Sequence, residues 1–99
     1  MRAKDIAEVI KQYAVLKGMY AAYKTALSGT IYMIVKKDRM DDHWVKIRIG
    51  RHKLEDSKHY NDKFKTDDVD IDLYRTDGKW DPKPAIDLLE ERYGKEKEE

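Results

Sequence analysis

Apolar side chains recur at alternating three- and four-residue steps through the first part of the chain: Ile6, Val9, Tyr13, Leu16, Tyr20, Tyr23 and Leu27. This spacing places them on one stripe of a helix, so it predicts a long amphipathic helix over residues 5–28. Asp5 is expected to cap its start, with Glu8 three positions on in the order of a capping box. Gly18 is the weak point of the pattern and marks a bend or a break into two helices.

The pattern then becomes that of strands. Residues 30–37 read TIYMIVKK, a β-branched and aromatic run that is typical of a central strand. Residues 43–49 alternate between apolar and polar positions, so the two segments are predicted to pair as an antiparallel hairpin. Residues 50–68 lose the pattern and predict no single structure.

The last third predicts a strand and a helix. Alternation returns over residues 69–73, and Lys79-Trp80 is expected to begin a short returning strand after a tight turn. Pro82 and Pro84 suit the first turn of a helix that stops near Gly94.

Together these elements predict an α+β fold. Its antiparallel sheet has three to four strands, and the long N-terminal helix and the C-terminal helix pack on one face. A chain of 99 residues has room for one core, so residues 1–99 are expected to form a single domain with a frayed charged tail at 95–99.

Composition narrows the setting in which the protein works. The chain has no cysteine, which excludes disulfides and thiolate metal sites. Charged residues make up 41% of it, and Asn and Gln occur once each, a combination that resembles a hyperthermophile protein. No stretch approaches the ~20 apolar residues of a membrane span, and no leader begins the chain, so we expect an intracellular protein.

An acidic run is the most unusual local feature. On a strand, Asp68, Asp70 and Asp72 share one face at spacings of ~7 Å, and we call these three residues the acidic stripe. Such carboxylates can hold Mg²⁺ or Ca²⁺, can dock on a basic partner, or can simply form a solvated outer face. The run lacks the glycine and the spacing of a calcium loop.

A basic tract surrounds the predicted hairpin and comprises Lys36, Lys37, Lys46, Arg48, Arg51 and Lys53. Trp44 shares its alternation with Lys46 and Arg48, and Arg51 follows the strand; these four residues are the basic hairpin face. Phosphate contacts beside an aromatic ring that stacks on bases form a known nucleic-acid-binding pattern. Nearby acids dilute this charge, and the sequence pI is only about 7.9.

A third candidate surface is the tyrosine-bearing part of the first predicted helix. Tyr13, Leu16, Tyr20 and Tyr23 form a stripe suited to core packing or to a homodimer seam. Groups for chemistry are sparse by contrast. The three histidines lack familiar metal-ligand spacing, and no nucleophile elbow or phosphate loop is present. We therefore expect a non-catalytic protein with no cofactor and no metal site.

The IYMIV and DVDIDLY segments, the tyrosine-rich opening and the short cysteine-free frame resemble a group of small proteins from filamentous and rod-shaped viruses of hot acidic springs. The resemblance implies a viral protein acting in the cytoplasm of an archaeal host. Some proteins of related viruses inhibit the host's CRISPR interference machinery by binding its large subunit, but no motif carries that activity onto residues here. The first hypothesis is thus a module that binds a host protein through the acidic stripe. The alternative is nucleic-acid binding through the basic hairpin face.

Overall fold

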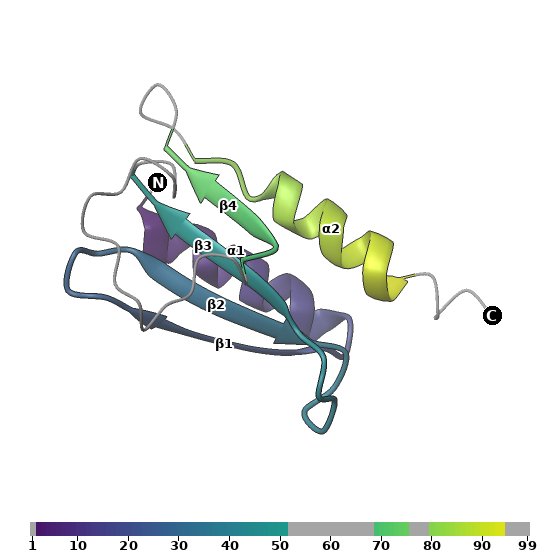
Figure 1. Ribbon diagram of the computed structural model, residues 1–99. Helices are drawn as coiled ribbons and strands as arrows, with labels where there is room; N and C mark the ends of the chain where they lie inside the picture. The colour runs from purple at the N-terminus through teal and green to yellow at the C-terminus, as the bar shows by residue number, and fades with distance from the viewer. Residues whose placement is uncertain (1, 52–68, 76–79, 95–99) are drawn as a thin grey trace.

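A four-stranded mixed sheet with two helices organises the protein (Figure 1). The computed structural model describes residues 2–51, 69–75 and 80–94. The elements follow one another as α1 (Ala3–Leu16), β1 (Tyr20–Thr25), β2 (Ile31–Lys36), β3 (Val45–Gly50), β4 (Ile71–Tyr74) and α2 (Lys83–Tyr93). The strand order is β1-β2-β3-β4, with β1, β2 and β3 mutually antiparallel and β4 parallel to β3.

Both helices lie on the same face of the sheet. α1 contacts β1, β2 and β3, α2 contacts β4, and the two helices contact each other (Figure 1). The predicted α+β class, with an N-terminal and a C-terminal helix on one face, is therefore confirmed. Within the described part of the chain, no helix covers the opposite face of the sheet, which we call the helix-free face.

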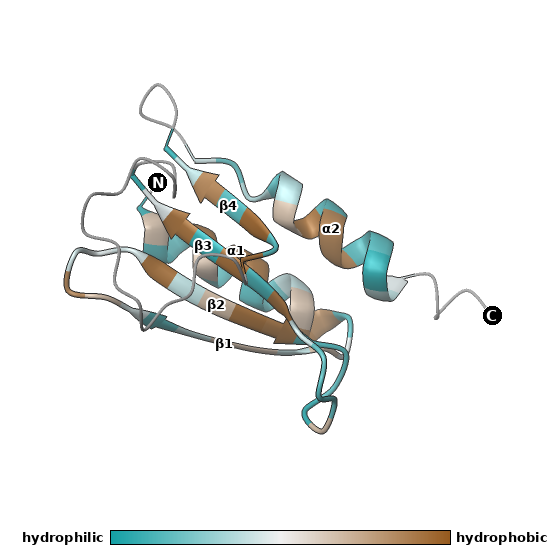
Figure 2. Ribbon diagram, viewed as in Figure 1, coloured by the Kyte–Doolittle hydropathy of each residue, from teal (hydrophilic) through white to brown (hydrophobic). Residues whose placement is uncertain are grey.

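The core lies between the helices and the inward side chains of the central strands. Burial alternates along β2, where every second residue is buried, whereas in β3 every residue except Lys46 is buried; Figure 2 shows the apolar positions along both strands. Fully buried residues are contributed by every layer: Ile6 and Ile10 of α1, Ile31, Met33 and Val35 of β2, Val45, Ile47 and Ile49 of β3, and Leu89 of α2.

The predicted helix over residues 5–28 is wrong beyond Leu16. Gly18 has a φ of 79°, a left-handed conformation that ends the helix, and the chain then reverses into β1. At the other end, α1 begins at Ala3, and Asp5 accepts the backbone N–H of Arg2 at 2.9 Å. Asp5 thus serves the helix start from inside the first turn rather than as the cap itself.

A short loop fixes the register of β1 on β2. The Ala26 N–H donates to the Thr30 carbonyl at 2.8 Å, and the Gly29 N–H donates to the Ala26 carbonyl at 2.9 Å. Gly29 takes a φ of 91°, as a three-residue hairpin loop requires at this position. The resulting register sets Tyr20 opposite Lys36.

The β2–β3 hairpin was predicted correctly, whereas the sheet as a whole is mixed rather than antiparallel. β4 pairs with β3 in parallel, with Arg48 opposite Asp72. A parallel neighbour needs a crossover between the two strands, and residues 52–68, whose structure the sequence left open, lie outside the described residues. Trp80 is not in a strand, and the tight turn expected before it falls in residues 76–79, which lie outside the described residues.

Candidate functional site

The acidic stripe does not form a separate acidic surface. Asp70 accepts the backbone N–H of Lys46 at 2.8 Å, and its other oxygen lies 3.3 Å from Arg92 of α2. Asp72 pairs with Arg48 of β3, Nη1 to Oδ1, at 2.8 Å. Two carboxylates of the stripe are thus used to join β4 to β3 and to α2. Asp68 lies outside the described residues.

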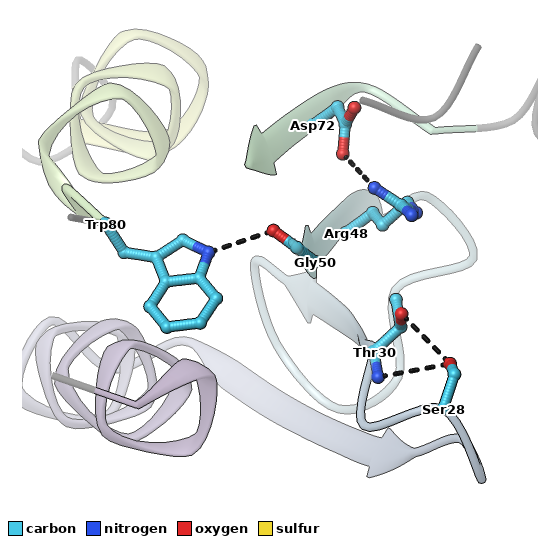
Figure 3. A network of polar contacts seen from close by, with 6 residues as sticks. All are labelled: Ser28, Thr30, Arg48, Gly50, Asp72 and Trp80. Carbon is cyan, nitrogen blue, oxygen red and sulfur yellow. Dashed lines mark hydrogen bonds and ion pairs between the residues drawn. The ribbon is translucent and has the colours of Figure 1, made fainter. Parts of the chain in front are cut away.

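Arg48 is the residue of the basic hairpin face that the structure places differently from the prediction. Its side chain is only 4% exposed, and Figure 3 shows it extended toward Asp72 on the neighbouring strand. A Cβ built on Gly50 would lie 3.0 Å from the Arg48 guanidinium, so the absence of a side chain at this position makes room for the cation. The acidic stripe and the basic hairpin face therefore each contribute one residue, Asp72 and Arg48, to the same internal ion pair.

Trp80 closes the same end of β3. Its indole N–H donates to the Gly50 carbonyl at 3.0 Å (Figure 3), and the same carbonyl accepts the Arg75 N–H at 3.1 Å. The Arg75 guanidinium lies 5.6 Å from the centre of the Trp80 ring. This tryptophan joins the start of α2 to the sheet, which is a structural use of an aromatic ring beside a cation.

The other tryptophan, Trp44, lies just before β3 and is 44% exposed. The Lys36 ammonium lies 5.6 Å and the Lys46 ammonium 5.8 Å from the centre of its ring, both within cation–π range. Lys36 belongs to β2 and is opposite Tyr20 of β1. The Tyr20 side chain is 36% exposed. We call Tyr20, Lys36, Trp44 and Lys46 the Trp44 patch; it occupies one end of the helix-free face.

The turn that leads into the patch carries its own acids. Asp38 accepts the Met40 N–H at 2.9 Å and Asp41 accepts the His43 N–H at 2.9 Å, so both carboxylates stabilise the turn. The hydrogen bond from the His43 backbone is the main cause that lowers the pKa of Asp41. Asp38, Asp41 and Asp42 lie in the sequence between the two lysines, so the patch is distinguished by its aromatic rings beside cations rather than by a large net charge.

The remaining member of the basic hairpin face is not brought to the patch. Arg51 is exposed at the far end of β3, about 20 Å along the strand from Trp44. Of the four predicted residues, the structure therefore assembles Trp44 and Lys46, with Lys36 and Tyr20 as additional members. Alternation along one strand placed Trp44 and Lys46 together. Lys36 was already part of the predicted basic tract, but its position beside Trp44, like that of Tyr20, required the register of the neighbouring strands.

The predicted tyrosine seam is not one surface. Tyr20 and Tyr23 belong to β1, not to a helix, and point to opposite faces of the sheet. The Tyr23 hydroxyl donates to Glu8 of α1, and this hydrogen bond raises the pKa of Tyr23. The Tyr13 hydroxyl donates to Glu90 of α2. Burial, followed by that hydrogen bond, raises the pKa of Tyr13 to about 12. Leu16 is 85% exposed at the end of α1.

Within residues 2–51, 69–75 and 80–94, no three His, Asp or Glu side chains come together as metal ligands. None of the helices described there has the length and apolar character needed to cross a bilayer.

Comparison with known proteins gives no family. No family model, no curated protein and no solved structure matches the chain. The resemblance to small archaeal-virus proteins stays a prediction.

Proposed function

We propose that the protein is a non-catalytic binding protein whose ligand is single-stranded nucleic acid, held on the Trp44 patch. The observation that carries this proposal is the partly exposed Trp44 ring with two lysine ammonium groups within 6 Å of its centre. A base stacks on such a ring regardless of its sequence. It displaces the ammonium groups that lie over the ring in the free protein, and these then contact the flanking phosphates.

The wider hypothesis of a host-protein partner bound by the acidic stripe has less support. The carboxylates of Asp70 and Asp72 already lie against Arg92 and Arg48. Docking a basic partner there would compete with contacts that hold β4 in place. Lys36 and Trp44 contact each other, but within the described residues neither is held by a carboxylate, and truncating either side chain should not disturb the core.

Binding to an oligothymidylate in low salt, measured by fluorescence anisotropy, tests the proposal. Trp44→Ala should weaken binding about 5- to 150-fold, the equivalent of the ~1–3 kcal/mol of one stacked base. Contacts of Lys36 and Lys46 with two phosphates of a single strand predict a slope of log K against log salt of about −1.4. Lys36→Ala should reduce that slope by about 0.7.

Lys4→Ala is the matched control, because Lys4 is an exposed lysine at the opposite end of the protein, in the first turn of α1. It should leave the affinity and the slope unchanged. Absence of any anisotropy change at low salt would contradict the proposal, and so would equal losses for Lys4→Ala and Lys36→Ala. If the wild type captured an acidic protein and Trp44→Ala did not, the ligand of the Trp44 patch would be a protein and not a nucleic acid, which would contradict the proposal.

A further inference from the structure

Three residues of the patch form a row that crosses three strands. Tyr20 is opposite Lys36 in the β1–β2 register, and Val35 is opposite Val45 in the β2–β3 register, so position 44 falls opposite Lys36. The row on the helix-free face therefore reads Trp44, Lys36, Tyr20, with the cation between two aromatic residues.

The spacing of this row limits what can bind to it. Neighbouring strands lie about 4.8 Å apart, so the backbones at Trp44 and Tyr20 are separated by about 10 Å. Stacked bases in a duplex are about 3.4 Å apart along each strand and leave no free faces for side chains. Two aromatic rings at this separation can be reached only by bases that have been pulled out of a stack.

The surroundings of Tyr20 leave room for such a base. Ala22, the next residue of β1 on the same face, has a side chain too short to cover the ring, and it is opposite Ile34. Within the described residues, no strand pairs with the outer edge of β1. A ligand strand that arrives from β3 can therefore leave across this edge.

We infer that the nucleic-acid strand runs across β3, β2 and β1, with one base stacked on Trp44, a second base stacked on Tyr20 and the intervening phosphate held by Lys36. This inference rests on the proposed function and adds to it a path, a second stacking residue and a selection against duplex. It assigns to Tyr20 a role in ligand binding in place of the predicted dimer seam.

Substitution at Tyr20 tests the path. Tyr20→Ala should weaken binding of an oligothymidylate of about 12 nucleotides by about 5- to 150-fold, whereas Tyr20→Phe, which keeps the ring, should bind within about twofold of the wild type. Tyr74→Ala is the matched control, because Tyr74 is 38% exposed on the same face but lies on β4, at the far end from the row. It should leave the affinity unchanged. The corresponding duplex should bind at least about tenfold more weakly than the single strand.

A second measurement avoids substitutions that disturb folding. Oligonucleotides in which one thymine, or two adjacent thymines, are replaced by abasic sites are titrated into the wild-type protein and into Tyr20→Phe. Removing two adjacent bases should cost more than removing either one, and both proteins should respond alike. Unchanged affinity of Tyr20→Ala, with binding still lost in Trp44→Ala, would overturn the path and leave the proposed function standing. If the wild type bound no oligonucleotide, both the proposed function and the path would be overturned. A duplex bound as tightly as the single strand would overturn the path alone.

Discussion

The two ends of β3 use the same kinds of residue in opposite ways. At the Gly50 end, Arg48 is buried against Asp72, and Trp80 donates its N–H to a backbone carbonyl, so cation, acid and ring all serve the fold. At the other end, Trp44 and its lysines face outward on the sheet. A cation beside an aromatic ring is thus no evidence of binding by itself. Burial separates the two regions: the Arg48 side chain is 4% exposed, whereas Trp44 is 44% exposed.

The largest effect is expected from breaking the buried pair. Asp72→Asn removes the negative charge that pairs with the buried Arg48 guanidinium and should lower the free energy of unfolding by about 3 kcal/mol, toward the lower end for such pairs because Asp72 is 21% exposed. Urea denaturation measures this change. Asp87→Asn breaks an ion pair of similar length, 2.7 Å from Lys83 on the surface of α2, and should lower the free energy of unfolding by at most about 0.5 kcal/mol. Equal losses in the two variants would remove burial as the distinction between the regions.

A smaller effect is expected from the glycine beneath the guanidinium. Gly50→Ala places a methyl group 3.0 Å from an arginine side chain that Asp72 holds in position, and overpacking of this kind should cost about 1–2 kcal/mol. Combining it with Arg48→Ala should abolish that extra cost, since the methyl group then meets no guanidinium. Additive losses in the double variant would show that the glycine is required for another reason.

A smaller difference in the free energy of unfolding is expected between substitutions of the two tryptophans. Trp80→Phe removes the N–H donated to Gly50 and should lower the free energy of unfolding by about 1 kcal/mol. Trp44→Phe should leave stability unchanged, because the ring is partly exposed and no backbone bond depends on it. Thermal melts of the two variants compare the regions directly. A destabilised Trp44→Phe would indicate a structural role for the patch.

The smallest effect is confined to alkaline pH. The pKa of Tyr13 is raised from 10.0 to about 12 in the folded protein, so the stability linked to it is complete below pH 10 and is lost as the pH rises toward 12. Tyr13→Phe should remove this part of the decline, measured as a flatter dependence of unfolding free energy on pH over that interval. An unchanged slope would show that burial and the contact with Glu90 do not raise the pKa of Tyr13 in the folded protein. Ligand binding at the Trp44 patch should not change with this variant at neutral pH.

Much of the fold could be predicted because several segments have one dominant pattern. The IYMIV run and the alternation around Ile47 gave the central hairpin, and the two prolines gave the start of α2. β1 was missed because its sequence, YAAYKT, contains helix-favouring alanines and tyrosines at helical spacing. Pairing with β2 overrides that preference, and the left-handed Gly18 was the only local sign of the break.

The site was only partly predictable for a related reason. Alternation along β3 gives the face on which Trp44, Lys46 and Arg48 lie, but not how deeply each is buried. The burial of Arg48 depends on Asp72, which becomes its neighbour only when β4 pairs in parallel with β3. No local pattern indicates that pairing. Likewise, Lys36 and Tyr20 join Trp44 only through the registers of two strand pairs.

The most direct test of the Trp44 patch uses the protein's two tryptophans as separate reporters. In Trp80→Phe the sole tryptophan is Trp44, and titration with an oligothymidylate at low salt should quench its fluorescence, with the quenching reversed by added salt. In Trp44→Phe the remaining Trp80, held against the Gly50 carbonyl, should show no comparable change. Quenching of Trp80 alone, or of neither tryptophan, would contradict the account.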